Sequence, residues 1–285
     1  MFGKRPDANL AENISTMRRF LPFVSPRRND SAFYMFQDVE VDAALEYLEK
    51  KNRGRPQERR ITLFHLFLRS TSQGVFLRPG VNRFVKGGQL WQRDGVWLSY
   101  SAMREIKDGS VMISVKRRFE PESESLEEMV DGFYQRLNPQ RAGKKTRSDK
   151  EMSWLLRLPS VVVLFLMKLL ALADYFGLMP RAMIEPDPLF TSVFMANLGS
   201  IDYPAGFHHL WEYGTCSIFG VMGRVEPAEN GRRKMQLAWT YDERIADGLY
   251  SYYTLDGIRE RLENPELLEL TTDELAKRER EGPVR

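Results

Sequence analysis

The stretch that decides the fold lies near the end of the chain and reads Trp239-Thr240-Tyr241-Asp242-Glu243-Arg244-Ile245-Ala246-Asp247-Gly248. It follows an apolar run at residues 235–239 that predicts a β-strand, and it precedes a tyrosine-rich helical pattern. The polar turn between these two apolar elements carries four charged side chains. Because an unpaired buried charge costs several kcal/mol, we expect these charges to be paired or to lie at a cleft.

This block resembles the Asp-His-Arg-x-x-Asp-Gly signature of the acyltransferase (E2) domain of 2-oxo acid dehydrogenase complexes, which has the fold of chloramphenicol acetyltransferase. Asp242, Arg244, Asp247 and Gly248 match the signature, and Glu243 stands at the histidine position. In the family, the histidine is the general base that takes the proton from a thiol or an alcohol. The aspartate four residues later holds the site together through a salt bridge.

Other segments are similar to the same family over roughly residues 14–270. The family's Thr-Ile-Ser-Asn-Leu-Gly strand and turn is similar to residues 194–199, which read Phe-Met-Ala-Asn-Leu-Gly. Its Ala-Ile-Leu-Gly-x-Gly-Arg strand is similar to residues 218–225. The resemblance also implies that Asp247 pairs with an arginine of the N-terminal segment, for which Arg18 and Arg19 are the candidates.

The order of strand and helix patterns is mixed, with strands in both halves of the chain and helices between them. This order predicts an α+β fold, a two-layer sandwich of the chloramphenicol acetyltransferase-like type with helices over a largely antiparallel sheet. We expect one domain over residues 1–285, with its core at about 14–270. No lipoyl or subunit-binding domain and no linker of the kind that joins them is recognised.

Local signals set several element boundaries. Gly87-Gly88 predicts a two-residue hairpin turn. Ser125 with Glu128 predicts a capping box at the start of a helix. Residues 1–30 are basic and are expected to be irregular.

Charge and cysteine content limit the function classes. The net charge of +3 is too small to indicate nucleic-acid binding, and we predict no nucleic-acid partner and no metal site. The single cysteine, Cys216, excludes an internal disulfide and suits a reducing compartment. It has no clear histidine partner, so we expect a buried structural thiol. Residues 1–13 are polar and do not form a signal peptide, which predicts a cytoplasmic protein.

Replacing the histidine changes the chemistry that the site can perform. Acyl transfer from a thioester needs a base with a pKa near neutrality, and an imidazole at about 6.5 meets this need. A glutamate starts near 4.3, roughly four units below a thiol at about 8.5. Glu243 is therefore a weak candidate for the general base. The alternative is that Glu243 forms a structural ion pair with Arg244.

The donor to the oxyanion of the tetrahedral intermediate is also replaced. In the family a serine or threonine supplies it, and Ala196 stands at that position, beside the matching Asn197 and Gly199. The loss of one such donor costs about 10²–10³ in rate. Ser192 and Ser200 could supply a hydroxyl only in a shifted register. The other residues of the motifs are present, whereas the general base and the oxyanion donor are replaced. This pattern indicates a scaffold retained for binding or assembly.

The histidines offer a second candidate base. His208 and His209 open a stretch, residues 208–214, that resembles the His-His-x-x-x-Asp-Gly signature of condensation-type acyltransferases, although Tyr213 stands at the aspartate position. Either histidine is a candidate relocated base, and otherwise both are surface or interface residues. Thr62 predicts a helix N-cap, and His65 just after it is expected to be a core histidine.

Residues 153–179 are the second unusual feature of the sequence. The runs 161–167 and 169–173 are apolar and are interrupted only by Lys168. A helix from Pro159 to Asp174 would span about 24 Å at about 1.5 Å per residue, which is short of the roughly 30 Å of a bilayer core.

Three interpretations of the helix at 159–176 remain open. It is the core helix of an ordinary trimer, an interfacial helix on a membrane that is helped by basic residues at 141–147, or a lid over a long acyl chain. The E2 resemblance implies a homotrimer with a channel at the subunit interface, which a coenzyme A or acyl-CoA substrate would enter. It implies no covalently bound cofactor.

The sequence thus leads to three functional hypotheses. The first is a degenerate E2-like protein, a pseudoenzyme that binds an acyl thioester, a lipid or a partner with little or no turnover. The second is an active acyltransferase that uses Glu243, His208 or His209 as its base. The third is a trimeric scaffold at a membrane surface, so that the cytoplasmic protein would be peripheral to the membrane.

Overall fold

The computed structural model describes residues 5–104, 112–143 and 153–281 of the chain. The described strands are β1 (Ala8–Leu10), β2 (Ala32–Glu40), β3 (Arg83–Lys86), β4 (Gln89–Arg93), β5 (Val96–Met103), β6 (Met112–Phe119), β7 (Val193–Asn197), β8 (Ile218–Pro227) and β9 (Arg233–Asp242). The described helices are α1 (Thr16–Val24), α2 (Asp42–Lys51), α3 (Leu63–Leu77), α4 (Leu126–Arg141), α6 (Ser160–Tyr175), α7 (Arg181–Ile184), α8 (Gly248–Glu263) and α9 (Thr272–Glu281). Part of the predicted basic stretch, residues 144–147, lies outside the described ranges.

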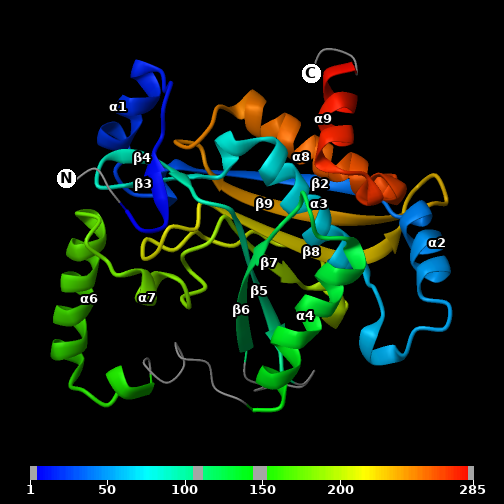
Figure 1. Ribbon diagram of the computed structural model, residues 1–285, viewed down its shortest axis with the longest axis horizontal. Coiled ribbons are helices and arrows are strands. Elements are labelled where there is room, and N and C mark those ends of the chain that lie inside the picture. The colour runs from blue at the N-terminus through cyan, green and yellow to red at the C-terminus, as the bar shows by residue number, and fades with distance from the viewer. Residues whose placement is uncertain (1–4, 105–111, 144–152, 282–285) are drawn as a thin grey trace.

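A six-stranded sheet forms the centre of the molecule, in the order β2-β9-β8-β7-β5-β6 (Figure 1). Strand β7 runs parallel to both of its neighbours, and the remaining pairs are antiparallel. A smaller sheet, β1-β4-β3, is built from the hairpin and the N-terminal segment. The predicted α+β sandwich over a largely antiparallel sheet is therefore confirmed.

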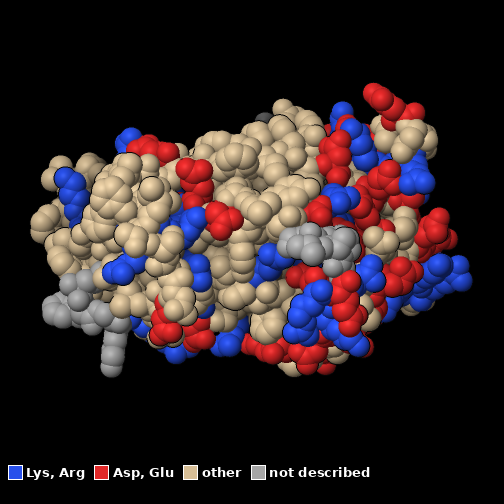
Figure 2. Space-filling model, turned by 90° about the horizontal axis from the view of Figure 1, so that it is seen from above, with Lys and Arg blue, Asp and Glu red and all other residues tan. Residues whose placement is uncertain are grey.

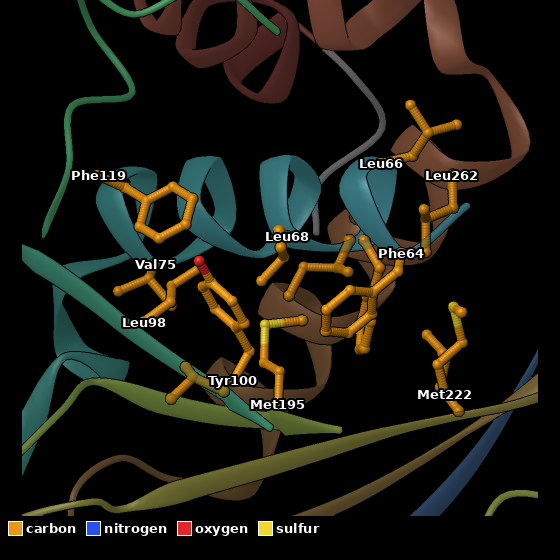
Figure 3. Close-up of a cluster of buried hydrophobic side chains, with 14 of the residues drawn as sticks. Phe64, Leu66, Leu68, Val75, Leu98, Tyr100, Phe119, Met195, Met222 and Leu262 are labelled. Carbon is orange, nitrogen blue, oxygen red and sulfur yellow. The ribbon is translucent and has the colours of Figure 1, made fainter. Parts of the chain in front are cut away.

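Helices α3, α4 and α8 cover one face of the large sheet, and the main core lies between the two layers. Figure 3 shows Phe64 and Leu68 of α3 lying over Tyr100 and Met195 of the sheet. Helix α3 is buried along nearly its whole length because the sheet lies on one side and α8 on the other. Gly74 allows this close approach, since a Cβ there would lie 2.9 Å from Ile258.

The local signals hold where the structure describes them. Gly87 and Gly88 have φ values of +61° and +71°, which glycine adopts readily, and they join β3 to β4. Ser125 caps α4, and the Glu128 side chain accepts the Ser125 amide at 2.8 Å in return. Thr62 is the N-cap of α3.

The prediction of an irregular N-terminal segment was wrong. Its described part contains β1, which pairs antiparallel with β4, and α1, which Ser15 caps by accepting the Arg18 amide at 3.4 Å. The hydrogen bonds of β1 come from a strand about eighty residues away, which a local sequence pattern does not encode.

The second face of the large sheet is covered in part by the segment between β7 and β8. Leu210 and Cys216 of this segment pack on Phe194 and Phe219, which lie on neighbouring strands. Beyond this cover, the side chains of β2 on this face stay exposed, and Tyr34 and Phe36 contact the ring of Phe207.

Helix α6 stands apart from both layers, at the left edge of the molecule in Figure 1. It confirms the helix predicted for the apolar stretch, within one or two residues at each end. Asp174 is its one buried residue, so the apolar side chains of α6 do not form a core within the described chain.

Candidate active site

The turn after β9 is built on a buried ion pair between Asp242 and Arg244. The Arg244 guanidinium donates from Nε to Oδ1 at 2.8 Å and from Nη2 to Oδ2 at 2.7 Å, and the Arg244 amide donates to Oδ1 at 3.1 Å. Asp242 is fully buried and Arg244 is 2% exposed. Two charges of the motif therefore neutralise each other inside the protein.

This pair also ties the turn to two distant segments. Arg244 Nη1 donates to the carbonyl oxygens of Ser25 and Pro26 at 2.8 and 3.0 Å. Arg28 lies with its Nε 3.8 Å from the second carboxylate oxygen of Asp242, and it donates to the carbonyls of Trp211 and Gly214. The Asp242–Arg244 pair therefore fixes the shape of the turn and the path of the N-terminal segment.

Glu243 lies on the other side of the turn, with its side chain exposed. Its amide donates to the Ser31 carbonyl at 3.0 Å. Its carboxylate has no hydrogen bond or ion pair with any residue that the structure describes. The predicted alternative, an ion pair between Glu243 and Arg244, was wrong because Asp242 already occupies the Arg244 guanidinium.

Asp247 is the N-cap of α8. Its Oδ1 accepts the Tyr250 amide at 2.7 Å, which satisfies one of the free amides of the first helical turn. Within the described ranges, no ion pair joins Asp247 to Arg18 or Arg19, so the predicted salt bridge is not formed. Arg18 does reach the turn, where its Nη1 donates to the carbonyls of Glu243 and Arg244 at 2.9 and 3.1 Å.

Ala196 and Asn197 end the interior strand β7, at the end of the sheet opposite to Glu243. Asn197 Oδ1 accepts the Ser200 amide at 3.1 Å, and Ser200 Oγ donates back to the Asn197 carbonyl at 2.8 Å. Gly199 permits this tight turn, since a Cβ there would lie 2.5 Å from a carbonyl oxygen of β8. Ser192 accepts the amide of a β5 residue, so both nearby hydroxyls already bind the main chain.

The strand register places Ala196 and Glu243 far apart in one chain. Ala196 pairs with Val221, which pairs with Ala238 on β9, and Glu243 follows five residues further along. At about 3.3 Å per residue, the separation along the strands is about 17 Å. A single chain therefore does not bring the two replaced positions together.

A cavity of about 410 Å³ opens beside Ala196. His65 lines it, and its Nδ1 accepts the Thr62 amide at 3.0 Å, so that the ring proton is carried by Nε2. Burial lowers the pKa of His65 to about 3, which keeps the ring neutral. His65 is therefore the core histidine that was predicted, on the wall of a cavity between α3, α4 and the end of β7.

His208 and His209 lie on the second face of the sheet. The His208 ring stacks on Phe219 with 4.2 Å between ring centroids, and its Nδ1 lies 2.7 Å from the His209 carbonyl. This contact assigns the proton to Nδ1 and leaves Nε2 of His208 as the basic nitrogen. Burial lowers the pKa of His208 below its ordinary value, whereas His209 is exposed.

Cys216 is fully buried, and its thiol donates to the Ile218 carbonyl at 3.2 Å. Burial raises the pKa of the thiol, so the nucleophilic thiolate is disfavoured. This agrees with the structural role expected from the sequence.

No protein-family model matches the sequence, and no curated protein matches it. Solved structures do match. The dihydrolipoamide acetyltransferase (E2p) of Azotobacter vinelandii is 12% identical over 92% of this chain and 95% of its own, with a TM-score of 0.58. The cubic core of a pyruvate dehydrogenase multienzyme complex is 14% identical over 92% of this chain and 95% of its own, with a TM-score of 0.56.

Chloramphenicol acetyltransferase is 13% identical over 90% of this chain and 98% of its own, with a TM-score of 0.52. At these identities the likeness concerns the fold, and it agrees with the resemblance seen in the sequence. The protein therefore has the chloramphenicol acetyltransferase-like fold of the dihydrolipoamide acetyltransferases.

Proposed function

We propose that this protein is a degenerate member of the coenzyme A-dependent acyltransferase family, which binds an acyl thioester, a lipid or a partner with little or no turnover. One observation carries the proposal. In the Azotobacter enzyme, a serine, a histidine and an asparagine have a role in the catalytic mechanism. By the sequence motifs, the corresponding positions here are Ala196, Glu243 and Asp247.

The surroundings of these positions support the view that acyl transfer has been lost, rather than that other residues have taken over the roles of base and oxyanion donor. Glu243 is exposed to water, so its carboxylate lacks the desolvated and partnered setting in which carboxylates act as general bases. Ala196 has no donor, and the hydroxyls of Ser192 and Ser200 are already bound to the main chain. The buried Asp242–Arg244 pair, in contrast, is intact.

A homotrimer is the assembly that this proposal includes. The 17 Å estimated above between the levels of Ala196 and Glu243 supports a site completed by a second copy of the chain. A similar solved structure is the cubic core of a multienzyme complex, which supports a homo-oligomer. Figure 2 shows that charged residues gather towards the end that carries α2 and α9, and that most of the middle of this face is uncharged, with scattered charges towards the other end.

Exposed apolar residues on α1 fit the same assembly. Met17, Phe20 and Phe23 are exposed at spacings of three residues, which places them on one face of the helix. Exposed apolar patches of this kind mark interaction surfaces. In the proposed oligomer, this face of α1 packs against the neighbouring subunit.

A second candidate is an active acyltransferase with a changed base. His208 favours it, because the contact of Nδ1 with the His209 carbonyl leaves Nε2 free to accept a proton. Phe219 beneath this ring pairs with Thr240, three residues before Glu243, so His208 lies towards the Glu243 end of the sheet. A third candidate is a trimeric scaffold at a membrane surface.

Two measurements test the proposal. Calorimetry with coenzyme A and with short and long acyl-CoA should detect binding, and no heat at millimolar ligand would count against a thioester ligand. Transfer from the same acyl-CoA donors to a dithiol should run at the background rate. A rate clearly above background that is lost in His208→Ala would favour the second candidate instead.

A further inference from the structure

Helix α6 and its flanks present an apolar surface that nothing in the described chain covers. The α6 arm, as we call residues 153–178, leaves Val161 75%, Phe165 65% and Leu164 63% exposed. Trp154, Leu156, Leu169 and Leu172 add to this surface. In Figure 1 the helix stands beside the sheet rather than on it. Isolated exposed apolar residues are normal on proteins, but a contiguous set of this kind marks a contact surface.

The arm has no polar face. An ordinary surface helix keeps one polar side towards water, whereas α6 carries between Val161 and Ala173 a single polar side chain, Lys168. Protein interfaces carry about one hydrogen bond per 100–200 Å² and a polar rim. The outward surface of α6 offers few donors or acceptors for such bonds, so a purely apolar surrounding suits it better.

The exposed charges of the α6 arm are all of one sign. Residues 153–178 contain three charged side chains, and the two that are exposed, Arg157 and Lys168, are basic. The third, Asp174, is 2% exposed and is held by Arg5. Beyond the arm, Arg181 is paired with Glu185 at 3.5 Å. An apolar surface with cationic groups and no exposed carboxylate complements an anionic lipid surface.

The arm is held at a fixed place by its C-terminal end. Arg5 Nη1 donates to Asp174 Oδ1 at 2.7 Å and to the Asp174 carbonyl at 3.0 Å, and Lys86 Nζ lies 2.8 Å from Oδ2. Lys86 belongs to β3, and Arg5 precedes β1. The ion cluster therefore joins α6 to the small sheet and presents the rest of the helix outward.

Helix α6 is too short to cross a bilayer, and its length fits a position in the plane of the membrane–water interface. Its 16 residues cover about 24 Å, less than the roughly 30 Å of a hydrocarbon core. None of the described helices is both long and apolar enough to cross a bilayer. Trp154 and Tyr175 stand near the two ends of the arm, and such amphipathic rings prefer the headgroup level.

We propose that the α6 arm docks this protein onto an anionic membrane, with Phe165 and its apolar neighbours among the acyl chains and Arg157 and Lys168 at the lipid headgroups. Membrane docking by the α6 arm is independent of whether the protein transfers acyl groups, because the arm contains neither Ala196 nor Glu243. In this proposal, lipid covers the apolar surface of α6, and neither a second copy of the chain nor a protein partner does.

The test is flotation of the full chain with vesicles of phosphatidylcholine and phosphatidylglycerol, compared with phosphatidylcholine alone. The wild type should float with the anionic vesicles. Each basic residue near such a surface contributes about a fivefold gain in affinity, so replacing Arg157 and Lys168 with glutamine should reduce the affinity about 25-fold. The variant Leu164→Glu should reduce binding by about tenfold or more, because it places a carboxylate at the centre of the apolar surface.

The matched control is Leu249→Glu on α8, because Leu249 and Leu164 are both leucines with 63% exposure. It should float like the wild type, and circular dichroism should show both variants folded. Equal binding of Leu164→Glu and wild type would overturn the proposal. A wild type that stays out of the vesicle fraction, with an oligomer that Leu164→Glu dissociates in sedimentation, would overturn it in favour of a second copy.

Discussion

Replacing Asp242 with alanine should destabilise the protein far more than any change at Glu243 beside it. The Asp242 carboxylate is fully buried and accepts three hydrogen bonds from Arg244, with Arg28 3.8 Å away. Its removal leaves two buried guanidinium groups without their carboxylate. Breaking a buried pair in this way costs about 3–5 kcal/mol, so the free energy of unfolding should fall by that amount.

The assay is urea denaturation at a fixed protein concentration, since an oligomer's stability depends on that concentration. Glu243→Ala is the first control, and it should change the free energy of unfolding by about 0.5 kcal/mol or less because its carboxylate has no partner among the described residues. Glu40→Ala is the second, and it breaks an exposed pair with Arg232 that is worth about 0–1 kcal/mol.

A cost below about 1 kcal/mol for Asp242→Ala would show that the pair does not hold the turn. An equal cost for Glu243→Ala and Asp242→Ala would also contradict this prediction. In that case Glu243 would have a structural partner that the described chain does not contain.

Three further predictions concern burial. Burial lowers the pKa of Lys116 from 10.5 to about 7. Between pH 7 and about pH 10 the folded protein has therefore lost this proton while the unfolded chain keeps it, so the free energy of unfolding should rise with pH over this range. Urea denaturation of Lys116→Met at several pH values should lack that rise. Burial likewise lowers the pKa of His65 from 6.5 to about 3. Below about pH 6.5 unfolding therefore takes up a proton at His65, and the free energy of unfolding should fall as the pH drops. His65→Gln should make this fall with pH less steep, and an unchanged pH dependence would contradict a neutral, buried His65. A Cβ on Gly220 would lie 2.7 Å from the buried ring of Trp239, so Gly220→Ala should cost about 1–3 kcal/mol in chemical denaturation, and a neutral result would show that the ring can move.

Much of the fold could be predicted because its signals are local. The positive φ values of Gly87 and Gly88 and the caps at Thr62 and Ser125 depend on residues within a few positions, and the structure has them as expected. Strand β1 depends on pairing with β4, and its own three residues do not specify that partner.

The pairing of charges in the turn after β9 was predicted wrongly from the sequence. Residues 243 and 244 form a turn in which the Asp242 carboxylate accepts the amide and the guanidinium of Arg244, and Glu243 faces away. An aspartate that accepts the amide two residues later is typical of turns, so this pairing was available in the sequence. The capping role of Asp247 was also available, because an aspartate before a helix commonly accepts an amide of the first turn.

The central claim is that the framework of an acyltransferase site remains while its base and its oxyanion donor are gone. The most direct test is the rate of acyl transfer from acyl-CoA to a dithiol by the wild type, Glu243→Gln and the double variant Ala196→Ser/Glu243→His. We expect background rates for the first two and a gain for the double variant, because each restored group contributes about 10²-fold or more to such reactions. Rapid turnover by the wild type that disappears in Glu243→Gln would contradict it.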